Sequence, residues 1–233
     1  MKKRVLILYT GGTMGMRYQT NGSLAPEKGY LTERINELPE MQRPEMPSFT
    51  IKEYAPLLDS SCMGPKDWVN IATDIEANYL TYDGFVVIMG TDTMAYCASA
   101  LSFMLENLGK TVIVTGSQIP FVDVYNDARR NLIVSIIFAS ASEFPEVCIC
   151  FNDKLLRANR AVKVHSTGLN AFDSPNYPPL GELGSSIIER KDLALPQPKG
   201  PFRVHKQVLI PTFNLIITLL LTHLLICISL MLM

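Results

Sequence analysis

Hydroxyl side chains and one carboxylate follow four apolar runs of the sequence, where buried strands would end. The runs cover residues 4–9, 49–54, 85–89 and 111–115, and the polar groups after them are Thr10 and Thr13, Ser60 and Ser61, Thr91, Asp92 and Thr93, and Ser117 and Gln118. Ligands of open α/β sheets bind at the carboxyl ends of strands, so we expect these groups to share one cleft. One such group alone would often only cap a helix. Together they favour a nucleophile with orienting groups over a metal site.

A threonine or serine hydroxyl becomes a nucleophile only when a neighbouring base takes its proton. Histidine is a poor candidate for that base, because none of the three histidines lies beside a strand-end hydroxyl. HExxH and GxSxG are both absent. A desolvated lysine paired with a carboxylate can serve instead.

The glycines at 11 and 12 would let backbone N–H groups approach a substrate oxygen, as an oxyanion hole requires. The same pair could cradle a phosphate. The surrounding YTGGTMGM, however, matches neither the P-loop nor the GxGxxG pattern.

Strands and helices that alternate along the chain must position these groups. A fifth strand is expected at 147–151, and helical spacing predicts helices from residue 65, over 94–108 with Gly109 as the terminating residue, and over 126–139. Residues 17–48 are expected to form a long loop with one short helix at 32–38. This alternation predicts a parallel, doubly wound sheet with helices on both faces.

Composition excludes several classes of protein. The 233 residues carry 21 Lys and Arg against 22 Asp and Glu, which argues against a nucleic-acid-binding module. Hydrophobic residues make up 48%, which argues against disorder.

Five cysteines without a CxxC pair make a disulfide framework or a zinc site unlikely, and Cys148 and Cys150 are expected on one face of a buried strand. The apolar run after Lys2-Lys3-Arg4 is too short for a secretory signal and favours a cytosolic strand.

The last part of the chain has a different character. Residues 174–201 are rich in proline and are expected to form a connection at the edge of a domain, whereas residues 208–233 hold no charged side chain. Residues 215–233 are long enough to span a bilayer, with basic residues before them that would keep the body in the cytoplasm. The alternative is translated non-coding sequence or a truncated gene model.

Five segments in this order resemble the bacterial-type L-asparaginases: YTGGTMGM at 9–16, DSSCM at 59–63, GFVVIMGTDTMAY at 84–96, SFMLENLGKTVIVTGSQIP at 102–120 and NRAVK at 159–163. The similarity is closest to the cytosolic type I branch, which includes the asparaginase-like domain of animal lysophospholipase/asparaginase proteins. The resemblance implies a flavodoxin-like domain that hydrolyses L-asparagine to L-aspartate and ammonia through an acyl-enzyme, without a metal or an organic cofactor. Members of the family are homo-oligomers, but the second domain that forms their dimer interface is expected to be missing here.

The resemblance assigns a role to each motif residue. It makes Thr13 the primary nucleophile, places Thr91, Asp92 and Lys163 in a second catalytic cluster with Lys163 on the side of the base, and lets Asp92 hold the α-amino group of the substrate. It also implies that Ser60 and, more weakly, Ser61 hold the α-carboxylate, and that Gly12 and Thr91 contact the substrate. Without the resemblance, Thr13 could be a turn residue, Thr91 and Asp92 a helix cap, and Lys163 a solvated charge.

Three positions depart from the family pattern. Met89 stands where members usually carry His. Residues 22–24 hold no tyrosine, although many members use one there to activate the first threonine; Tyr18 and Tyr30 are the alternatives nearby. Members also have a second, smaller α/β domain after the proline-rich connection, where this chain has the apolar tail. We therefore expect a catalytic domain at 1–195, a connection at 196–207 and an uncharged tail at 208–233.

Three functions remain open from the sequence. The leading hypothesis is a cytoplasmic L-asparaginase that acts through a threonine nucleophile. The second is a catalytically impaired fragment, with a membrane anchor at 215–233 or without one. The third is a lysophospholipase-type hydrolase, which the small, charge-matched site implied by Ser60 and Asp92 disfavours.

Overall fold

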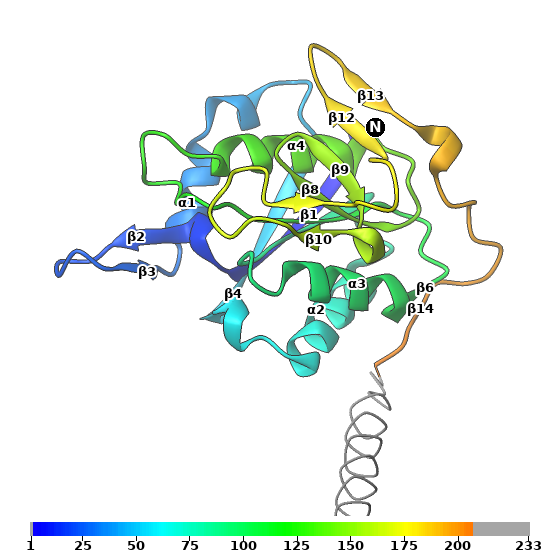
Figure 1. Cartoon of the computed structure of the whole chain (residues 1–233). Helices are drawn as coiled ribbons and strands as arrows, with labels where there is room; N and C mark the ends of the chain where they lie inside the picture. Colours follow the sequence, from blue (N-terminus) through cyan, green and yellow to red (C-terminus); the bar gives the residue numbers. More distant parts are fainter. Residues whose placement is uncertain (1, 207–233) are drawn as a thin grey trace, which may run out of the picture.

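An eight-stranded sheet forms the centre of the computed structural model, which describes residues 2–206 (Figure 1). In space its strands follow the order β13, β12, β9, β8, β7, β5, β1, β4. Their bounds are β1 (Arg4–Gly11), β4 (Ser48–Leu58), β5 (Gly84–Ile88), β7 (Val112–Thr115), β8 (Val147–Phe151), β9 (Lys154–Arg157), β12 (Gly181–Leu183) and β13 (Ile187–Glu189). The strands β4, β1, β5, β7 and β8 are parallel. Numbered along the chain they give the order 2-1-3-4-5, which is flavodoxin-like, as predicted.

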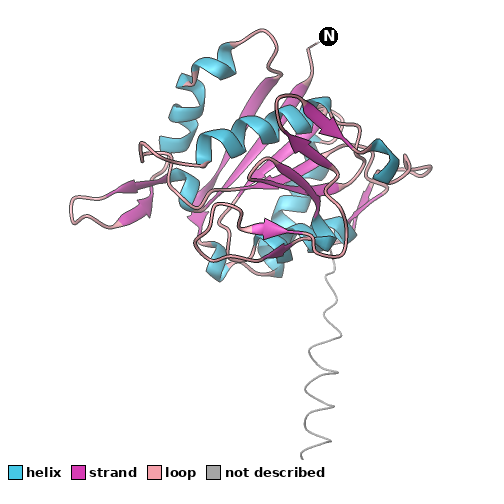
Figure 2. Cartoon of the chain, turned by 45° about the horizontal axis from the view of Figure 1, so that its top comes forward, coloured by secondary structure: helices cyan, strands magenta, loops and turns pink. Residues whose placement is uncertain are grey.

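Helices cover both faces of this sheet (Figure 2). One face packs against α2 and α3, and the other against α1 and α4. The helices are α1 (Tyr30–Glu37), α2 (Pro65–Asn78), α3 (Met94–Met104) and α4 (Ala128–Ala141). Side chains of a strand alternate between the faces: in β1, Leu6 and Leu8 face α2 and α3, whereas Val5 and Ile7 face α1 and α4. Cys148 and Cys150 share the α1 and α4 face, as predicted.

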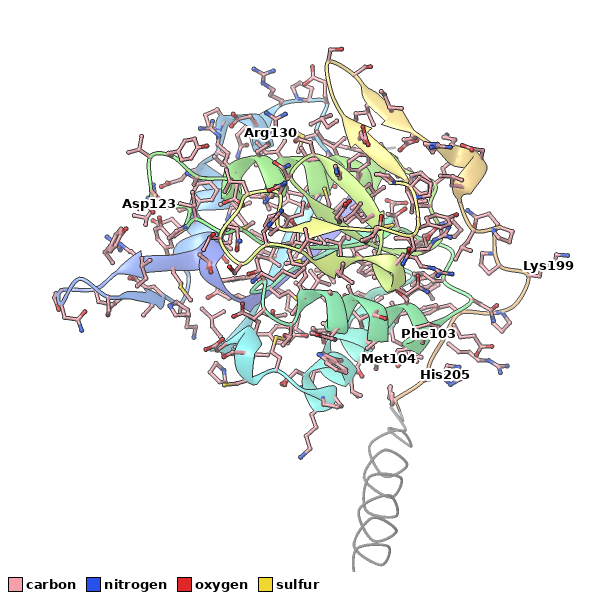
Figure 3. All side chains as sticks on the ribbon, viewed as in Figure 1. Phe103, Met104, Asp123, Arg130, Lys199 and His205 are labelled. Atoms are coloured by element: carbon pink, nitrogen blue, oxygen red, sulfur yellow. The ribbon has the colours of Figure 1, made fainter. Side chains whose placement is uncertain are left out.

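Helix α3 ends earlier than its sequence predicts. Leu105 and Glu106 form the short strand β6 (Leu105–Glu106), which pairs with β14 (Arg203–Val204). The left-handed residue after the helix is Asn107 (φ 54°), so the prediction that Gly109 ends it is wrong. The Gly109 N–H instead donates to the Tyr79 hydroxyl (2.7 Å). Figure 3 shows Met104 and His205 close together at this end of α3, where the His205 N–H donates to the Met104 carbonyl (2.8 Å).

Two segments expected to be irregular contain strands. The segment after the first strand holds the hairpin of β2 (Met16–Tyr18) and β3 (Leu24–Pro26), which projects from the body (Figure 1). The proline-rich segment holds β12 and β13, which extend the sheet beyond β9 by antiparallel pairing. The remaining elements are β10 (Val162–Lys163), β11 (Phe172–Asp173) and the 3-10 turns Thr13–Gly15, Pro39–Gln42, Ser60–Cys62, Ala158–Arg160 and Lys191–Leu193. Strands of only three residues are too short for patterns of hydrophobic alternation to reveal them.

A buried ion pair holds the proline-rich segment at the amino end of β8. Arg157 donates from Nε and Nη2 to the two carboxylate oxygens of Glu146 (2.5 and 3.0 Å) and from Nη2 to the Leu193 carbonyl (2.7 Å). The Leu195 N–H donates to Glu146 Oε1 (3.1 Å), and the Arg157 guanidinium lies over the Tyr177 ring (4.5 Å). Both carboxylate oxygens of Glu146 and two of the three guanidinium nitrogens of Arg157 are therefore hydrogen-bonded within the chain.

Within residues 2–206, no helix is both long and apolar enough to cross a membrane. The expected uncharged tail at 208–233, and with it the alternatives of an anchor or an artefact, lies outside the described residues. The expected boundary at residue 195 stays a prediction.

Candidate active site

The site lies where the strand order reverses, at the carboxyl ends of β1 and β5. Gly12 follows β1 with a φ of 94°, and a Cβ atom there would lie 2.5 Å from the Cα of Gly90, which follows β5. Only glycine allows this approach, because it tolerates positive φ and has no side chain. The two strand ends are thus held together by backbone contact.

Ser60 completes this close packing from the end of β4. Its side chain lies over Gly90, where an added Cβ would be 2.8 Å from the Ser60 Cβ. The hydroxyl of Thr93 donates to the Ser60 carbonyl (2.7 Å), which ties the loop after β5 to the loop after β4. Ser60 is buried, in agreement with a position inside the site. The role of Gly90 was missed by sequence reasoning, since close approach of two loops leaves no pattern within either one.

Thr91, Asp92 and Lys163 meet at the end of β5. Lys163 Nζ donates to the Thr91 hydroxyl oxygen (2.8 Å) and to Asp92 Oδ1 (2.9 Å). Thr91 is buried, whereas the Asp92 side chain is 63% exposed and that of Lys163 is 20% exposed. The sequence separates Lys163 from Thr91 by 72 positions, and the fold brings the two side chains into contact, while their catalytic roles stay a prediction.

The short pair β10 and β11 brings Lys163 to this place. Lys163 is opposite Phe172, which is buried in the α2 and α3 face, and the Val164 N–H donates to the Ala171 carbonyl (2.8 Å). An ammonium group has three donors and no acceptor. Two of its donors are used by Thr91 and Asp92, so this arrangement holds a lysine against a hydroxyl with a carboxylate beside it. That is the arrangement needed for a lysine to exchange a proton with a hydroxyl.

Thr13 begins the turn after Gly12 and is half-buried. Its hydroxyl makes no side-chain hydrogen bond within residues 2–206, so the structure does not join it directly to Thr91. The turn itself is fixed, since the Phe121 N–H donates to the Met14 carbonyl (3.1 Å) and the Gly15 N–H to the Gly12 carbonyl (3.3 Å). The Thr13 side chain is thus carried on a firmly held turn beside the glycine contact.

Ser61 differs from Ser60 in its surroundings. Its side chain is exposed, and its backbone N–H donates to Asp59 Oδ1 (2.9 Å), which caps the short turn. The structure therefore shows a cap at Ser61 and brings no other site side chain to its hydroxyl.

Two departures from the family pattern, Met89 and the missing tyrosine at 22–24, can be located in the fold. Met89 is fully buried among apolar side chains of the α2 and α3 face, and its N–H donates to the Thr115 carbonyl (3.0 Å), so the loop that follows starts from an ordinary strand end. Tyr18 is 52% exposed on the projecting hairpin. Tyr30 is buried at the start of α1; burial raises its pKa, while Arg34 and Arg17 act in the opposite direction. Within residues 2–206, neither tyrosine hydrogen-bonds to Thr13.

Gln118 lies beside Thr91, and Asp127 holds the backbone of Gln118. The Thr91 hydroxyl lies 3.3 Å from Gln118 Oε1, and the Gln118 amide nitrogen donates to the carbonyls of Ser166 (2.9 Å) and Gly168 (3.2 Å). The Asp127 carboxylate accepts the N–H groups of Gln118 (3.0 Å) and Ile119 (2.9 Å). Gln118 was visible in the sequence as a strand-end group, but its partners come from a loop about fifty positions away.

Metal ligation has no support among the described residues, since no group of three or more His, Cys, Asp and Glu side chains there could hold an ion. The four described cysteines, Cys62, Cys97, Cys148 and Cys150, are free thiols.

Residues 4–194 match the family model described as "Asparaginase, N-terminal". The chain belongs to this asparaginase family. It is 51% identical over 204 residues to L-asparaginase 1 of Escherichia coli (strain K12), covering 88% of this chain and 60% of that protein. It is 42% identical over 212 residues to the 60 kDa lysophospholipase of Mus musculus, covering 82% of this chain and 37% of that protein.

Solved structures agree with the asparaginase assignment. The crystal structure of L-asparaginase I from Vibrio cholerae superposes with a TM-score of 0.82 at 50% identity, covering 88% of this chain and 61% of that one. The chain therefore spans about 60% of the length of these bacterial relatives.

Proposed function

We propose that this chain hydrolyses L-asparagine to L-aspartate and ammonia through a threonine nucleophile. The observation that carries the proposal is the contact of Lys163 Nζ with both Thr91 Oγ1 and Asp92 Oδ1 at the switch point of the sheet. The relatives named L-asparaginase support the same reaction. The site residues are proposed on the same basis: Thr13, Thr91, Asp92 and Lys163 for catalysis, and Gly12, Ser60, Ser61, Thr91 and Asp92 for binding.

The first half of the reaction forms an ester. The Thr13 oxygen attacks the side-chain amide carbon of asparagine, the bond to nitrogen breaks, and the nitrogen leaves as ammonia after taking up a proton. Backbone N–H groups near Gly12 would stabilise the negative oxygen that develops. Removal of the Thr13 proton needs a base, and we propose the neutral amine of Lys163 for that role, although the hydroxyl it contacts in the structure is that of Thr91 (2.8 Å).

The second half adds water to the ester. The Thr91 hydroxyl would orient the water, and Lys163 as a neutral amine would take a proton from it while the water oxygen bonds to the acyl carbon. The bond between that carbon and the Thr13 oxygen then breaks, L-aspartate leaves, and Lys163 returns the proton to the Thr13 oxygen. Asp92 has an exposed carboxylate with one oxygen on Lys163, so the other can accept the substrate's ammonium group. The atoms balance without any cofactor.

The test is ammonia release from L-asparagine by the purified chain of 233 residues in mild detergent. Thr91→Val removes the hydroxyl and keeps the volume; Thr81→Val makes the same change at an exposed threonine after α2. The proposal expects release by the chain and by Thr81→Val, with Thr91→Val at the blank. Equal rates for all three folded proteins would overturn it and favour the impaired-fragment hypothesis.

A lysophospholipid serves as the second substrate in the same assay, because one relative carries the name lysophospholipase. Release of fatty acid that Thr91→Val abolishes would replace the amide with an ester substrate.

We also propose a cytoplasmic location and homo-oligomers. Free buried thiols at Cys97, Cys148 and Cys150 suit a reducing compartment. Fractionation of cells tests the location: recovery in the soluble fraction supports it, and extraction by detergent alone would favour the anchored alternative. Light scattering of the purified chain tests the assembly.

A further inference from the structure

The orientation of the Gln118 side-chain amide is determined by its partners. Two backbone carbonyls, of Ser166 and Gly168, lie within 2.9 and 3.2 Å of one end of the amide. Carbonyls only accept hydrogen bonds, so the nitrogen must face them. The oxygen Oε1 is then the atom that faces the Thr91 hydroxyl (3.3 Å). The Gln118 side chain can therefore only accept from Thr91.

The orientation of the Thr91 hydroxyl follows from this. Before it gives up its proton for the proposed reaction, Lys163 can only donate, so the Thr91 oxygen accepts from it (2.8 Å). The hydroxyl's own hydrogen must then go to another acceptor, and Gln118 Oε1 is the acceptor the structure provides. A directed chain of hydrogen bonds results, from Lys163 through Thr91 and Gln118 to the 166–168 turn.

We propose that Gln118 is a positioning residue for the proposed reaction, on which this inference rests: it directs a lone pair of the Thr91 oxygen at Lys163 and joins the Lys163 loop to the end of β5. Gln118 acts through Thr91 and does not itself react. Its amide links the loop after β5 to the loop between β10 and β11, and the contact of Lys163 with Thr91 joins the same part of the chain.

The backbone of Gln118 is held independently of this side chain. Asp127, at the start of α4, accepts the N–H groups of Gln118 and Ile119, and Asn131 donates to the Gly116 carbonyl (3.0 Å). A change of the Gln118 side chain should therefore leave the loop after β7 in place. The effect of such a change on Thr91 and Lys163 can therefore be measured without a shift of the loop backbone.

Gln118→Glu provides a test that a purely structural role would not pass. The carboxylate keeps an acceptor facing Thr91, loses the donors to Ser166 and Gly168, and adds a negative charge one hydroxyl away from Lys163. The charged groups already near Lys163 are Asp92, which contacts it, Asp173 on the neighbouring strand β11, which pairs with Lys154 (3.6 Å), and Arg160 in the turn before β10. A nearby carboxylate favours the charged form of an amine.

The measurement is competitive labelling of the Lys163 amine with acetic anhydride across pH, read by peptide mass spectrometry. It needs no catalytic activity. Gln118→Glu should move the midpoint of labelling at Lys163 to higher pH by about one unit. The matched control is Gln42→Glu, an exposed glutamine whose amide also donates to a backbone carbonyl, that of Asn36 (2.9 Å). It should leave the midpoint where it is.

Gln118→Met keeps the volume and removes both the acceptor and the donors. It should lower the rate of ammonia release by about tenfold or more and leave KM within about twofold, because the proposal places Gln118 behind Thr91 and away from the substrate. Circular dichroism confirms that each variant is folded, and Gln118→Glu decides the matter if Gln118→Met is not.

The outcomes separate this inference from the proposed function. An unchanged labelling midpoint in folded Gln118→Glu overturns the positioning role, even if the chain releases ammonia. A shifted midpoint in a chain that releases no ammonia keeps the hydrogen-bond chain and overturns the proposed reaction.

Discussion

Two pairs of opposite charges lie at opposite ends of the sheet and differ in how completely they are satisfied. Glu146 and Arg157, at the amino end of β8, have side chains 4% and 12% exposed. Both Glu146 oxygens accept hydrogen bonds, and Arg157 also donates to the Leu193 carbonyl. Asp92 and Lys163, at the carboxyl end of β5, are 63% and 20% exposed. Among the described residues, Lys163 is the only side chain that hydrogen-bonds to Asp92.

The difference separates a structural pair from a reactive one. A buried pair must be fully matched, because a charge without partners inside a protein is costly. An exposed pair contributes little to stability, so its carboxylate and ammonium can change partners when a substrate arrives. We therefore expect changes at Glu146 to alter folding and changes at Lys163 and Asp92 to alter chemistry.

The largest expected effect is on catalysis at the reactive pair. Lys163→Met removes the amine and keeps most of the volume, so ammonia release should fall by about a thousandfold, as when a general base is lost. Lys154→Met is the control, since that lysine makes only an exposed pair with Asp173 (3.6 Å). If Lys163→Met released ammonia at the parental rate, the pair of Asp92 and Lys163 would not be the reactive one.

The next largest effect is expected on stability, when the carboxylate residue of each pair is replaced by leucine. Glu146→Leu leaves a buried guanidinium and an unpaired Leu195 N–H, so the free energy of unfolding should fall by about 3–5 kcal/mol. Asp92→Leu should change it by less than about 1 kcal/mol and yet abolish ammonia release. Urea unfolding measures both, with Glu143→Leu as the control for an exposed pair, that with Lys191 (3.7 Å). Equal losses at Glu146 and Asp92 would remove the distinction.

Backbone contact at the reactive end predicts a smaller loss. Gly12→Ala combines a positive φ with a clash against Gly90, and should lower the free energy of unfolding by about 2–5 kcal/mol. Gly22→Ala, also at positive φ (81°) but with nothing within 4 Å, should cost only about 1 kcal/mol. Denaturant unfolding of the two variants measures both losses. Equal losses of unfolding free energy would argue against the close approach of the ends of β1 and β5.

The smallest effect comes from thiols buried in the core between the two ends. Burial raises the pKa of Cys97 and of Cys150 to about 12. Their unfolded pKa is near 9, so the folded state holds protons that the unfolded state releases, and stability should be lost progressively from about pH 9 to pH 12. Each thiol contributes a slope of up to about 1.4 kcal/mol per pH unit.

Urea unfolding at pH 8, 9 and 10 measures that slope. Cys150→Ala should reduce it, whereas the exposed Cys62→Ala should not. A slope that Cys150→Ala leaves unchanged would show that this thiol is not protected by burial.

Much of this molecule follows from its sequence, because buried parallel strands are continuous apolar runs. The runs at β1, β5, β7 and β8 predict the sheet, and the order of the connecting helices predicts the doubly wound class. The strands β12 and β13 were not predicted, since they are three residues long and extend the sheet beyond β9 from within a proline-rich segment. Helix α3 was predicted too long, because the pairing of β6 with β14 joins residues about a hundred positions apart.

The residues of the candidate site also fall into those that the sequence predicts and those that it does not. Thr13, Ser60, Thr91 and Asp92 follow strands and could be expected at one edge from topology alone. Lys163 came from the resemblance, and the fold brings it to Thr91. Gln118, Gly90 and Asp127 act through contacts between distant loops, which neither composition nor spacing encodes. The role of Ser61 in binding stays a prediction.

The most direct measurement is the location of the acyl group. The chain is mixed with L-asparagine, quenched in acid within milliseconds to seconds, digested and mapped by mass spectrometry, with Lys163→Met treated in parallel. The account predicts an aspartyl ester on the peptide that holds Thr13 in the parent chain and no such ester in Lys163→Met. An ester on another residue, or equal signals from the two proteins, would contradict a reaction centre at this end of the sheet.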